Sequence, residues 1–485
     1  MHLVKLSQIY TNSDANDRMK VDFYAQMSDF SSQFLSSSIS AYLFTWDDML
    51  NAASKLKVGK ATATFVKAQH IFHGSPKLLL HLHLLYNSML SHGYVPHEFL
   101  SGTISPIIKD TKGDLTDSSN YRAVSLSPIF SQLFEYLLLD KFGMYLISDD
   151  LQFGFKRNHS TSHALYVLKS CVEYFQVHGS TTFVTFLDCS KAFDKVSHYG
   201  LFTKLMKRNV PFCFLNVLIY WYLNLRCRCQ WQGILGDYFP VSTGVRQGGV
   251  LSPQLFAVYV DDLINILRSR GIGCHILNTF LACLFFADDL CLISPTRSAM
   301  QELLDICFKY CEEINLSFND KKSKTLVFNM KPNHFIKPLS LNGCTIEIVN
   351  EWKYLGTTII SGKFFSFSAK KELRSFYASF NSLYNAKIKP DEPVMMKLLY
   401  STCLPILTYA SDVKFFSTSE MQSCQTAVNN AIRRIFGYNR WESIRQLRQE
   451  LGYKDLTTIF HSRKETFLRG ALTSGNHLVR FFANL

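Results

Sequence analysis

The stretch LACLFFADDLCLI, residues 281–293, holds two adjacent carboxylates, Asp288 and Asp289, in an otherwise apolar run. Burying a charge without a partner costs free energy, so the pair implies a compensating cation. The run is short and rich in residues favoured in strands, which predicts two strands with the acids at the tight turn between them. One more carboxylate from elsewhere in the chain would complete a site for divalent metal.

A third carboxylate, Asp188, ends another apolar segment. Residues 182–187 are predicted to form a short strand, and Phe193 follows Asp188 by five positions. An aspartate at a strand end is common, so Asp188 indicates a metal site only in combination with Asp288 and Asp289. Strands that end in carboxylates can hold two Mg²⁺ ions about 3.5–4 Å apart, the geometry of in-line nucleotidyl transfer. Because Mg²⁺ keeps waters and substrate oxygens in its shell, two or three protein carboxylates suffice.

The composition is that of a large folded protein that carries an excess of positive charge. A chain of 485 residues is too long for one compact core, so we expect several subdomains. The net charge is +13, and residues 361–485 contribute 18 Lys plus Arg against 9 Asp plus Glu. A localised basic region suggests nucleic acid as the partner, while a solvated basic helical face is the simpler alternative.

The 13 cysteines are scattered, and many lie in apolar runs. This pattern is typical of buried reduced thiols in an intracellular protein, so we expect a nuclear and cytoplasmic location. The spacings contain no zinc-binding array, and the N-terminus has no secretory signal. Apolar runs of membrane-spanning length are absent, so no membrane partner is expected. The oligomeric state cannot be inferred from these patterns.

Hydrophobic spacing and punctuating glycines predict the secondary structure around these motifs. Residues 1–45 are polar and serine-rich, and we expect a linker or the remnant of a preceding region. The other expected elements are a helix from Leu78 that ends at Gly93, a strand over 104–108, a helix over about 128–142, a glycine-rich loop over 244–249 followed by a helix, and a mostly helical region past 361 with Gly437 as a helix C-cap.

Taken in order, these motifs resemble the reverse transcriptase of a non-LTR (LINE-type) retrotransposon. They span residues 104–356, about half of the chain, and the glycine-rich segment is close to diagnostic. The segments that carry the resemblance are Lys109-Asp110, Asn120-Tyr121-Arg122, QFGF at 152–155 with Ser160-Thr161, FLDCSKAF at 186–193, GVRQGGVLSP at 244–253, FADD at 286–289, NDKK at 319–322 and Tyr354-Leu355-Gly356.

The resemblance implies catalytic and metal-binding roles position by position. Asp188 and Asp288 are the expected main ligands of two Mg²⁺ ions, for which Mn²⁺ is a possible substitute. Asp289 would complete the acidic cluster, and the backbone carbonyl of Cys189 would be a further ligand. Lys322 matches a lysine that protonates the leaving pyrophosphate, although a solvated lysine at a strand end is the simpler interpretation.

The resemblance also implies how the substrates are bound. Lys109 and Arg122 would clamp the triphosphate, and arginine suits this role because its fork binds phosphate oxygens bidentately. Phe193 would lie beneath the incoming sugar and exclude a 2′-hydroxyl, with simple core packing as the alternative. Gln247 would contact nucleotide and template, and Gly248 would allow a close backbone approach.

Residues Tyr354, Leu355 and Gly356 would belong to a hairpin that grips the primer end. A second segment, Tyr259-Val260-Asp261-Asp262, imitates the aromatic-x-Asp-Asp pattern of residues 286–289. Its apolar neighbours are spaced by fours, which predicts a helix whose two aspartates point to different faces. We therefore expect Asp261 and Asp262 to be polar-face residues and not metal ligands.

The expected fold class is α+β, a right-hand polymerase fold with a small antiparallel sheet backed by helices. Fingers and palm would occupy residues 46–360, and a helical, basic thumb would occupy 361–485. The expected function is RNA-directed DNA polymerase, with RNA template, DNA primer or target, and deoxynucleoside triphosphates as partners. A diverged, inactive copy that only binds RNA or DNA is the alternative from another class, and a group II intron-type or telomerase-like polymerase is the alternative within the enzymes.

Three departures from the family pattern concern the shape of the fingers and thumb. They are Thr62-Ala63-Thr64-Phe65 in place of a glycine-containing segment, Ala123 where proline commonly follows Tyr-Arg, and Tyr409-Ala410 where Tyr-Gly is common. None removes a catalytic group. Complete elements also carry an endonuclease before the polymerase, and residues 1–45 are too short for one. We therefore expect a fragment or truncated product without DNA-cleaving activity of its own.

Overall fold

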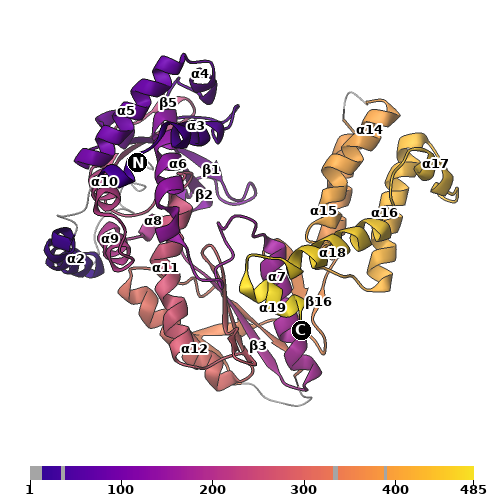
Figure 1. The fold of residues 1–485 in the computed structure, drawn as a ribbon. Coiled ribbons are helices and arrows are strands. Elements are labelled where there is room, and N and C mark those ends of the chain that lie inside the picture. Colours follow the sequence, from indigo (N-terminus) through magenta and orange to yellow (C-terminus); the bar gives the residue numbers. More distant parts are fainter. Residues whose placement is uncertain (1–13, 34–38, 331–336, 387–389) are drawn as a thin grey trace. The chain divides into compact units, whose positions relative to one another are not determined.

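The computed structural model describes residues 14–33, 39–330, 337–386 and 390–485. The chain forms two compact units that interleave in sequence (Figure 1). Unit 1 comprises the described parts of residues 1–155, 189–269 and 305–319. Unit 2 comprises those of residues 156–188, 270–304 and 320–485. The sequence expectation of several subdomains agrees with this division, while the boundaries expected at 45 and 360 stay predictions.

Unit 1 is built of helices around a small mixed sheet. The sheet has the order β2-β1-β4-β5, with β6 paired to β4; β1 and β2 are antiparallel, whereas β1 and β4 are parallel. Its strands are β1 (Ser101–Ile108), β2 (Tyr121–Leu126), β4 (Arg226–Trp231), β5 (Ile234–Leu235) and β6 (Phe239–Pro240). Its helices are α2 (Asp14–Gln33), α3 (Trp46–Ser54), α4 (Ala68–Phe72), α5 (Pro76–His92), α6 (Ile129–Phe142), α8 (Ala192–Lys195), α9 (His198–Lys207), α10 (Phe212–Leu223) and α11 (Ser252–Ser269).

Several helix boundaries follow from local sequence. Helix α5 begins with Pro76 at its first position after the cap Ser75, and Gly93 ends it in the left-handed conformation with φ +63°. Helix α11 begins directly after the glycine-rich loop and buries Leu255, Tyr259 and Leu263 on one face. These expectations, together with the strand at 104–108 and the helix at 128–142, are confirmed.

The expectation of a linker over residues 1–45 was wrong for residues 14–33. This part forms helix α2, which packs on α9 and buries Phe23 and Phe30. The ring of Phe23 lies 5.6 Å from the ring of Phe202. Apolar residues at 19, 23, 27 and 30 have helical spacing, a pattern that the polar composition of the segment concealed. Residues 1–13 and 34–38 lie outside the described residues.

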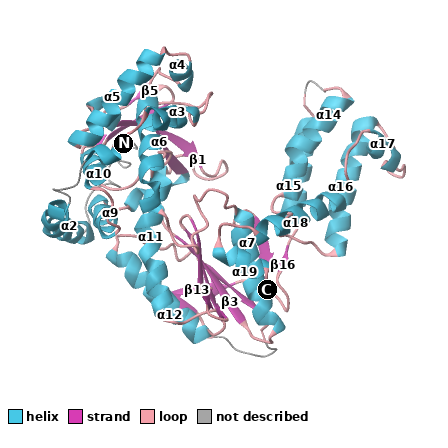
Figure 2. Ribbon diagram, viewed as in Figure 1, coloured by secondary structure: helices cyan, strands magenta, loops and turns pink. Residues whose placement is uncertain are grey.

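Unit 2 contains a six-stranded sheet of order β12-β13-β11-β3-β10-β9. Two of its strands, β3 and β13, are labelled in Figure 2. Strand β3 (Thr182–Asp188) lies between two antiparallel neighbours and is buried along its length except at its last residue, Asp188. Helix α7 (Thr161–Val177) packs on β3 and β9. The other strands are β9 (Cys283–Phe286), β10 (Asp289–Ser294), β11 (Lys324–Phe328), β12 (Leu339–Leu341) and β13 (Cys344–Ile348). A central strand that is buried on both faces explains the continuous apolar run TFVTFL.

The remainder of unit 2 is a small sheet followed by helices, as the sequence pattern past residue 361 predicts (Figure 2). The small sheet has β15 between β14 and β16. Helix α16 ends at Gly437, which has φ +70° and is the expected C-cap. The elements are β14 (Glu351–Tyr354), β15 (Thr357–Ile360), β16 (Ser366–Phe367), α13 (Lys370–Tyr384), α14 (Glu392–Leu398), α15 (Leu404–Thr408), α16 (Thr418–Phe436), α17 (Arg445–Glu450), α18 (Leu456–Leu472) and α19 (His477–Ala483). Unit 2 also contains the short hairpin of β7 (His275–Ile276) and β8 (Thr279–Phe280), whereas helix α12 (Arg297–Glu313) belongs to unit 2 up to Leu304 and to unit 1 from Asp305.

The cysteines are free thiols, and all except Cys189 and Cys344 are buried. This confirms the expectation of buried, reduced cysteines. In the described part of the chain, every helix is too short or too polar to span a lipid bilayer.

Candidate active site

The two adjacent carboxylates lie at a tight hairpin, as the sequence predicts. Strands β9 and β10 pair with Phe286 opposite Asp289, so Ala287 and Asp288 form a two-residue turn. Ala287 has φ +60°, a left-handed conformation that costs an alanine about 1–2 kcal/mol. The turn thus holds Asp288 at its tip and Asp289 at the first position of β10.

The third carboxylate, Asp188, lies directly opposite Asp289. The antiparallel register of β3 and β10 pairs these two residues at the ends of their strands. Side chains of directly opposed residues lie on the same face of a sheet, with Cβ atoms about 4.5–5.5 Å apart. The fold therefore brings Asp188 to the hairpin of Asp288 across a hundred residues of sequence.

The surroundings of the acidic cluster disfavour the ionised form of Asp289. Burial, followed by the neighbouring carboxylates of Asp288 and Asp188, raises the pKa of Asp289 to about 6. One cation lies nearby, because Lys322 Nζ is 3.8 Å from Asp188 Oδ2. That lysine side chain is 67% exposed, so solvent screens the pair and it compensates the cluster only weakly.

The donor set fits Mg²⁺, which prefers carboxylate oxygens. Among the described residues, no group of three or more His, Cys, Asp or Glu side chains is gathered closely enough to hold a metal ion. Magnesium usually completes its octahedral shell with water and with phosphate oxygens of the substrate. The three aspartates therefore suit a metal that arrives with a nucleotide, and not a fully protein-coordinated structural ion.

In unit 1, the glycine-rich loop lies against strand β2. Ser125 N donates to Gln247 O at 2.7 Å. Gly248 follows with φ +115°, and a Cβ there would come within 2.8 Å of Ser125 O. Only glycine fits at this position, because both its backbone conformation and the close approach of β2 exclude a side chain. The close approach expected at Gly248 is thus made to another strand of the protein.

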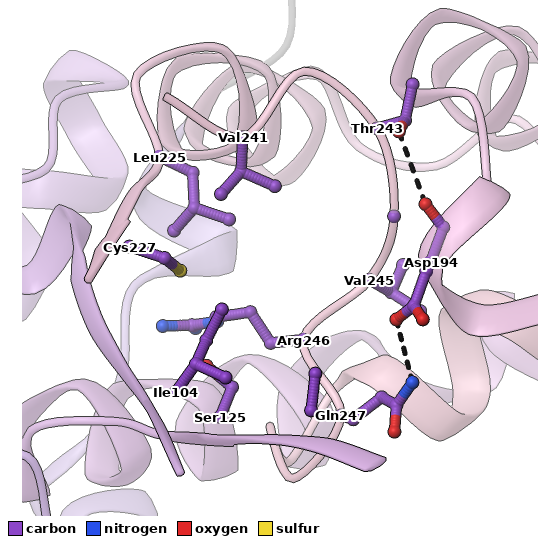
Figure 3. A pocket seen from close by; sticks show the side chains of 12 residues that line it. Ile104, Ser125, Asp194, Leu225, Cys227, Val241, Thr243, Val245, Arg246 and Gln247 are labelled. Atoms are coloured by element: carbon purple, nitrogen blue, oxygen red, sulfur yellow. Dashed lines mark hydrogen bonds between the residues drawn. The ribbon is translucent and has the colours of Figure 1, made fainter. Parts of the chain in front are cut away.

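The same loop is joined to the segment that follows Asp188 in the sequence. Gly244 N donates to Val196 O at 2.7 Å, and Val245 N donates to Phe193 O at 2.8 Å. Asp194 adds a side-chain contact, since its Oδ1 accepts from Gln247 Nε2 at 2.7 Å (Figure 3). The sequence pattern assigns no role to Asp194, because nothing in it indicates a partner 53 positions away.

Phe193, the expected gate against a 2′-hydroxyl, is only partly buried. Its ring stacks on Phe256 of α11 with centroids 4.4 Å apart, and it meets Phe155 edge-on at 5.8 Å. The ring is therefore fixed by aromatic neighbours and keeps a part of its surface exposed. Both the gating role and simple packing are compatible with this placement.

Lys109 and Arg122, the expected triphosphate clamp, lie at one end of the β1–β2 ribbon and are exposed. Arg122 pairs with Ile107 in the register, and Lys109 follows two residues later. Lys109 is the first residue after β1, and its N donates to Asn120 O at 2.8 Å, next to the start of β2. Lys109 Nζ donates to Ser119 O at 2.8 Å.

The expected primer-grip residues form a hairpin between β14 and β15. Tyr354 pairs with Thr357, and Leu355 and Gly356 make the turn with φ +44° and +78°. Tyr409 supports this turn from the C-terminal region: its hydroxyl donates to Leu355 O at 3.1 Å. A Cβ on Gly356 would lie 2.9 Å from the Tyr409 ring, so the ring requires glycine at this point of the turn.

The look-alike segment at 259–262 is helical and its aspartates do not form a joint site, as predicted. Asp262 accepts from Lys204 Nζ at 2.7 Å, whereas Asp261 accepts from Arg208 Nη2 at 2.6 Å. The expectation of a polar face was wrong for Asp261, which is buried. Its pair with Arg208 and its bond from Asp149 N satisfy the carboxylate inside unit 1.

Comparison with known proteins decides the family. The family described as "Reverse transcriptase (RNA-dependent DNA polymerase)" matches residues 108–359, just over half of the chain. The chain belongs to the reverse transcriptase family. Its α+β fold class, that of the right-hand polymerases, is confirmed by this membership.

The relatives among curated proteins are polymerases of non-LTR elements, which confirms the resemblance seen in the motifs. The "RNA-directed DNA polymerase from mobile element jockey" of Drosophila funebris is 27% identical over 395 residues, 76% of this chain and 41% of that protein. Its namesake from Drosophila melanogaster is 25% identical over 455 residues, 90% of this chain and 48% of that protein. The "Probable RNA-directed DNA polymerase from transposon X-element" of Drosophila melanogaster is 27% identical over 293 residues, 58% and 31%. In each case this reverse transcriptase chain spans less than half of the relative.

A solved structure of apo telomerase from Candida tropicalis, truncated from its C-terminal domain, is also similar. The match covers 64% of this chain and 63% of that chain, with 12% identity and a TM-score of 0.40. This structural similarity is too weak to support a conclusion about function.

Proposed function

We propose that this chain is an RNA-directed DNA polymerase that extends a primer 3′-hydroxyl on an RNA template with deoxynucleoside triphosphates. The observation that carries the proposal is the opposition of Asp188 and Asp289 at the ends of β3 and β10, with Asp288 in the adjoining turn. Two-metal nucleotidyl transfer needs such a set of carboxylates at strand ends.

In this proposal Asp188 and Asp288 are the main ligands of two Mg²⁺ ions, which Mn²⁺ could replace. Asp289 contributes negative charge beside them, and the carbonyl of Cys189, the residue after Asp188, is a further ligand. The bound metal lowers the pKa of the attacking hydroxyl and stabilises the charge that develops on the phosphate. The chain's own part is to hold these oxygens on rigid strand ends, so that little reorganisation is needed during the reaction.

Lys322 has the proposed role of a proton donor to the leaving pyrophosphate. Its ammonium is held near the acidic cluster by Asp188 at 3.8 Å, and it is exposed to solvent. An exposed, flexible lysine can reach a phosphate oxygen and can be reprotonated from water after each turnover.

Nucleotide binding is assigned to residues of unit 1. Lys109 and Arg122 present two exposed cations at one end of the β1–β2 ribbon for the triphosphate. Phe193 excludes a ribose 2′-hydroxyl with the exposed part of its side chain, and Gln247 contacts the nucleotide and template. Gly248 allows the loop that carries Gln247 to pack against β2.

The primer and template contacts are assigned to unit 2. The turn at Leu355 and Gly356 is the proposed primer grip, and the basic C-terminal region follows the backbone of the template–primer duplex. Residues 433–448 carry five arginines and one glutamate, and the side chain of Trp441 is 87% exposed beside Arg440. Contacts of this kind are made to phosphate and shape, so they are salt-dependent and largely independent of sequence.

A primer-extension assay tests the proposal. Purified wild-type protein, a DNA primer annealed to an RNA template, Mg²⁺ and deoxynucleotides should give extended product, and Asp188→Asn should abolish it. Binding of the same primer–template by both proteins, without extension by either, would instead indicate a non-catalytic nucleic-acid-binding protein.

A further inference from the structure

The amide of Gln247 has one strong side-chain contact, the 2.7 Å hydrogen bond to Asp194 (Figure 3). Asp194 is partly buried, and burial raises the pKa of its carboxyl, while the Gln247 amide and the cations Lys191 and Lys109 oppose that rise. A carboxylate that is withdrawn from water in this way needs a partner, and Gln247 supplies it.

The chemistry of the pair fixes which way the amide points. An ionised carboxylate only accepts hydrogen bonds, so the amide nitrogen of Gln247 must face Asp194. The amide oxygen then faces away from Asp194, where it can accept a hydrogen bond from another molecule. Without Asp194, rotation of the amide by 180° would present a donor or an acceptor with similar ease.

The backbone around Gln247 is already fixed by other contacts. Ser125 N holds the carbonyl of Gln247, and Thr243 Oγ1 donates to Asp194 O at 3.2 Å. Two further bonds, from Gly244 N and Val245 N, join the loop to residues 193–196. The remaining freedom of Gln247 lies in its side chain, and the Asp194 carboxylate removes that freedom.

We propose that Asp194 is a positioning residue that holds the Gln247 amide with its oxygen outward. The protein thereby offers the amide oxygen as an acceptor to the donor groups of a nucleotide or template base. This inference rests on the proposed function, because it assigns to Asp194 a role that acts through the nucleotide contact of Gln247. Asparagine at 194 would not do the same, since its own amide can turn and either accept from or donate to Gln247.

A double-mutant cycle of Asp194→Asn and Gln247→Ala tests the coupling by steady-state primer extension on an RNA template. Asp194→Asn alone should raise the KM for deoxynucleotide about tenfold, with kcat and the Kd for primer–template changed less than about threefold. In the Gln247→Ala background the same substitution should change the KM less than about twofold, because residues that act through one contact are not additive. Equal effects of Asp194→Asn in the two backgrounds, or no effect in either, would overturn the proposal.

A suppressor variant separates positioning from folding. Gln247→Glu places a second carboxylate against Asp194 and should raise the KM strongly through repulsion. Adding Asp194→Asn restores a donor–acceptor pair with an oxygen outward, and should lower that KM about tenfold. A purely structural role for Asp194 predicts that the second change makes the protein worse, which would contradict the inference.

Primer extension by the wild-type protein distinguishes a failure of the proposed polymerase function from a failure of the role proposed for Asp194. Extension by wild-type protein establishes the polymerase, and the cycle and suppressor then decide the role of Asp194. Absence of wild-type extension under conditions where the primer–template binds would overturn the proposed function and this inference with it.

Discussion

Asp188 and Asp289 face each other across two antiparallel strands, each at the end of its strand and next to the turn that carries Asp288. The arrangement is unfavourable by itself, because like charges directly opposite each other destabilise a sheet. Burial and both neighbours raise the pKa of Asp289 to about 6. We expect a site with such repulsion to bind a cation. The same carboxylates should lower the stability of the metal-free protein.

Asp289→Asn should therefore stabilise the metal-free protein at neutral pH. The pKa of Asp289 is higher in the folded protein than in the unfolded chain, so ionisation of Asp289 lowers the stability of the folded state. This loss develops as the pH rises from the ordinary pKa of an aspartate through about 6. After a discount for partial exposure, removing the charge should raise the free energy of unfolding by about 1–2 kcal/mol at pH 7.5. Urea unfolding in EDTA measures the change. The gain should vanish near pH 4, and equal or lower stability of the variant at pH 7.5 would contradict the account.

His198 should make unit 1 sensitive to acid. It is fully buried, its Nε2 donates to Gly244 O at 2.9 Å, and its ring meets Tyr222 edge-on at 5.1 Å. Burial lowers its pKa to about 4 from 6.5, whereas the bond to Gly244 partly opposes the shift. The unfolded chain then binds the proton more readily, so stability falls as the pH drops below 6.5, by about 2 kcal/mol at pH 5.

His198→Gln keeps a donor for Gly244 O without a titrating group. The variant should lose about 2 kcal/mol less stability than wild type between pH 7.5 and pH 5. Urea unfolding at the two pH values measures this difference, which is independent of the stability that the variant loses at neutral pH. Parallel losses in both proteins would show that His198 is not the group responsible.

Much of the fold and part of the site could be predicted from local sequence. Apolar runs that end in Asp188 and Asp289 indicate buried strands with carboxylates at their ends, and Gly93 marks a helix end in its local pattern. The partner of Asp194 could not be predicted, because a hydrogen bond between distant segments produces no periodic pattern in the sequence. The burial of Asp261 was missed for the same reason, since its partner Arg208 is the C-cap residue of a different helix, α9.

Helix α2 was missed for a different physical reason. Its stability comes from packing Phe23 against Tyr199 and Phe202 of α9, and its own composition is polar. A helix stabilised mainly by tertiary contacts is not indicated by its propensity alone. Composition therefore led to the expectation of a linker where the fold has a docked helix.

Ala410→Gly should stabilise unit 2. Ala410 has φ +54°, and the resemblance to the family implies glycine where this chain has Ala410. The left-handed conformation strains an alanine by about 1–2 kcal/mol, and the added flexibility of glycine in the unfolded chain offsets part of the gain. The net increase in the free energy of unfolding should be about 0.5–1 kcal/mol, measurable by urea unfolding. Loss of stability in the variant would mean that the backbone at 410 is not held in this conformation.

Phe193→Ala should relax the choice between deoxyribonucleotides and ribonucleotides. The ring stacks on Phe256 and leaves part of its surface exposed, so its removal opens space without unfolding α11. The ratio of kcat/KM for a ribonucleotide to that for its deoxy counterpart should rise at least about tenfold. A lower thermal unfolding midpoint with an unchanged ratio would show that Phe193 serves packing alone.

The central claim is that Asp288 belongs to a catalytic metal site, whereas the similar pattern at Asp262 does not. Asp262 is a matched control, because it follows the same aromatic-x-Asp-Asp order but lies on helix α11 and is paired with Lys204 of α9. The most direct measurement is the rate of primer extension on an RNA template with Mg²⁺ for wild type, Asp288→Asn and Asp262→Asn. Asp288→Asn should reduce the rate at least about a hundredfold, and Asp262→Asn should stay within about threefold of wild type. Extension by Asp288→Asn at the wild-type rate, or equal losses in the two variants, would contradict the account.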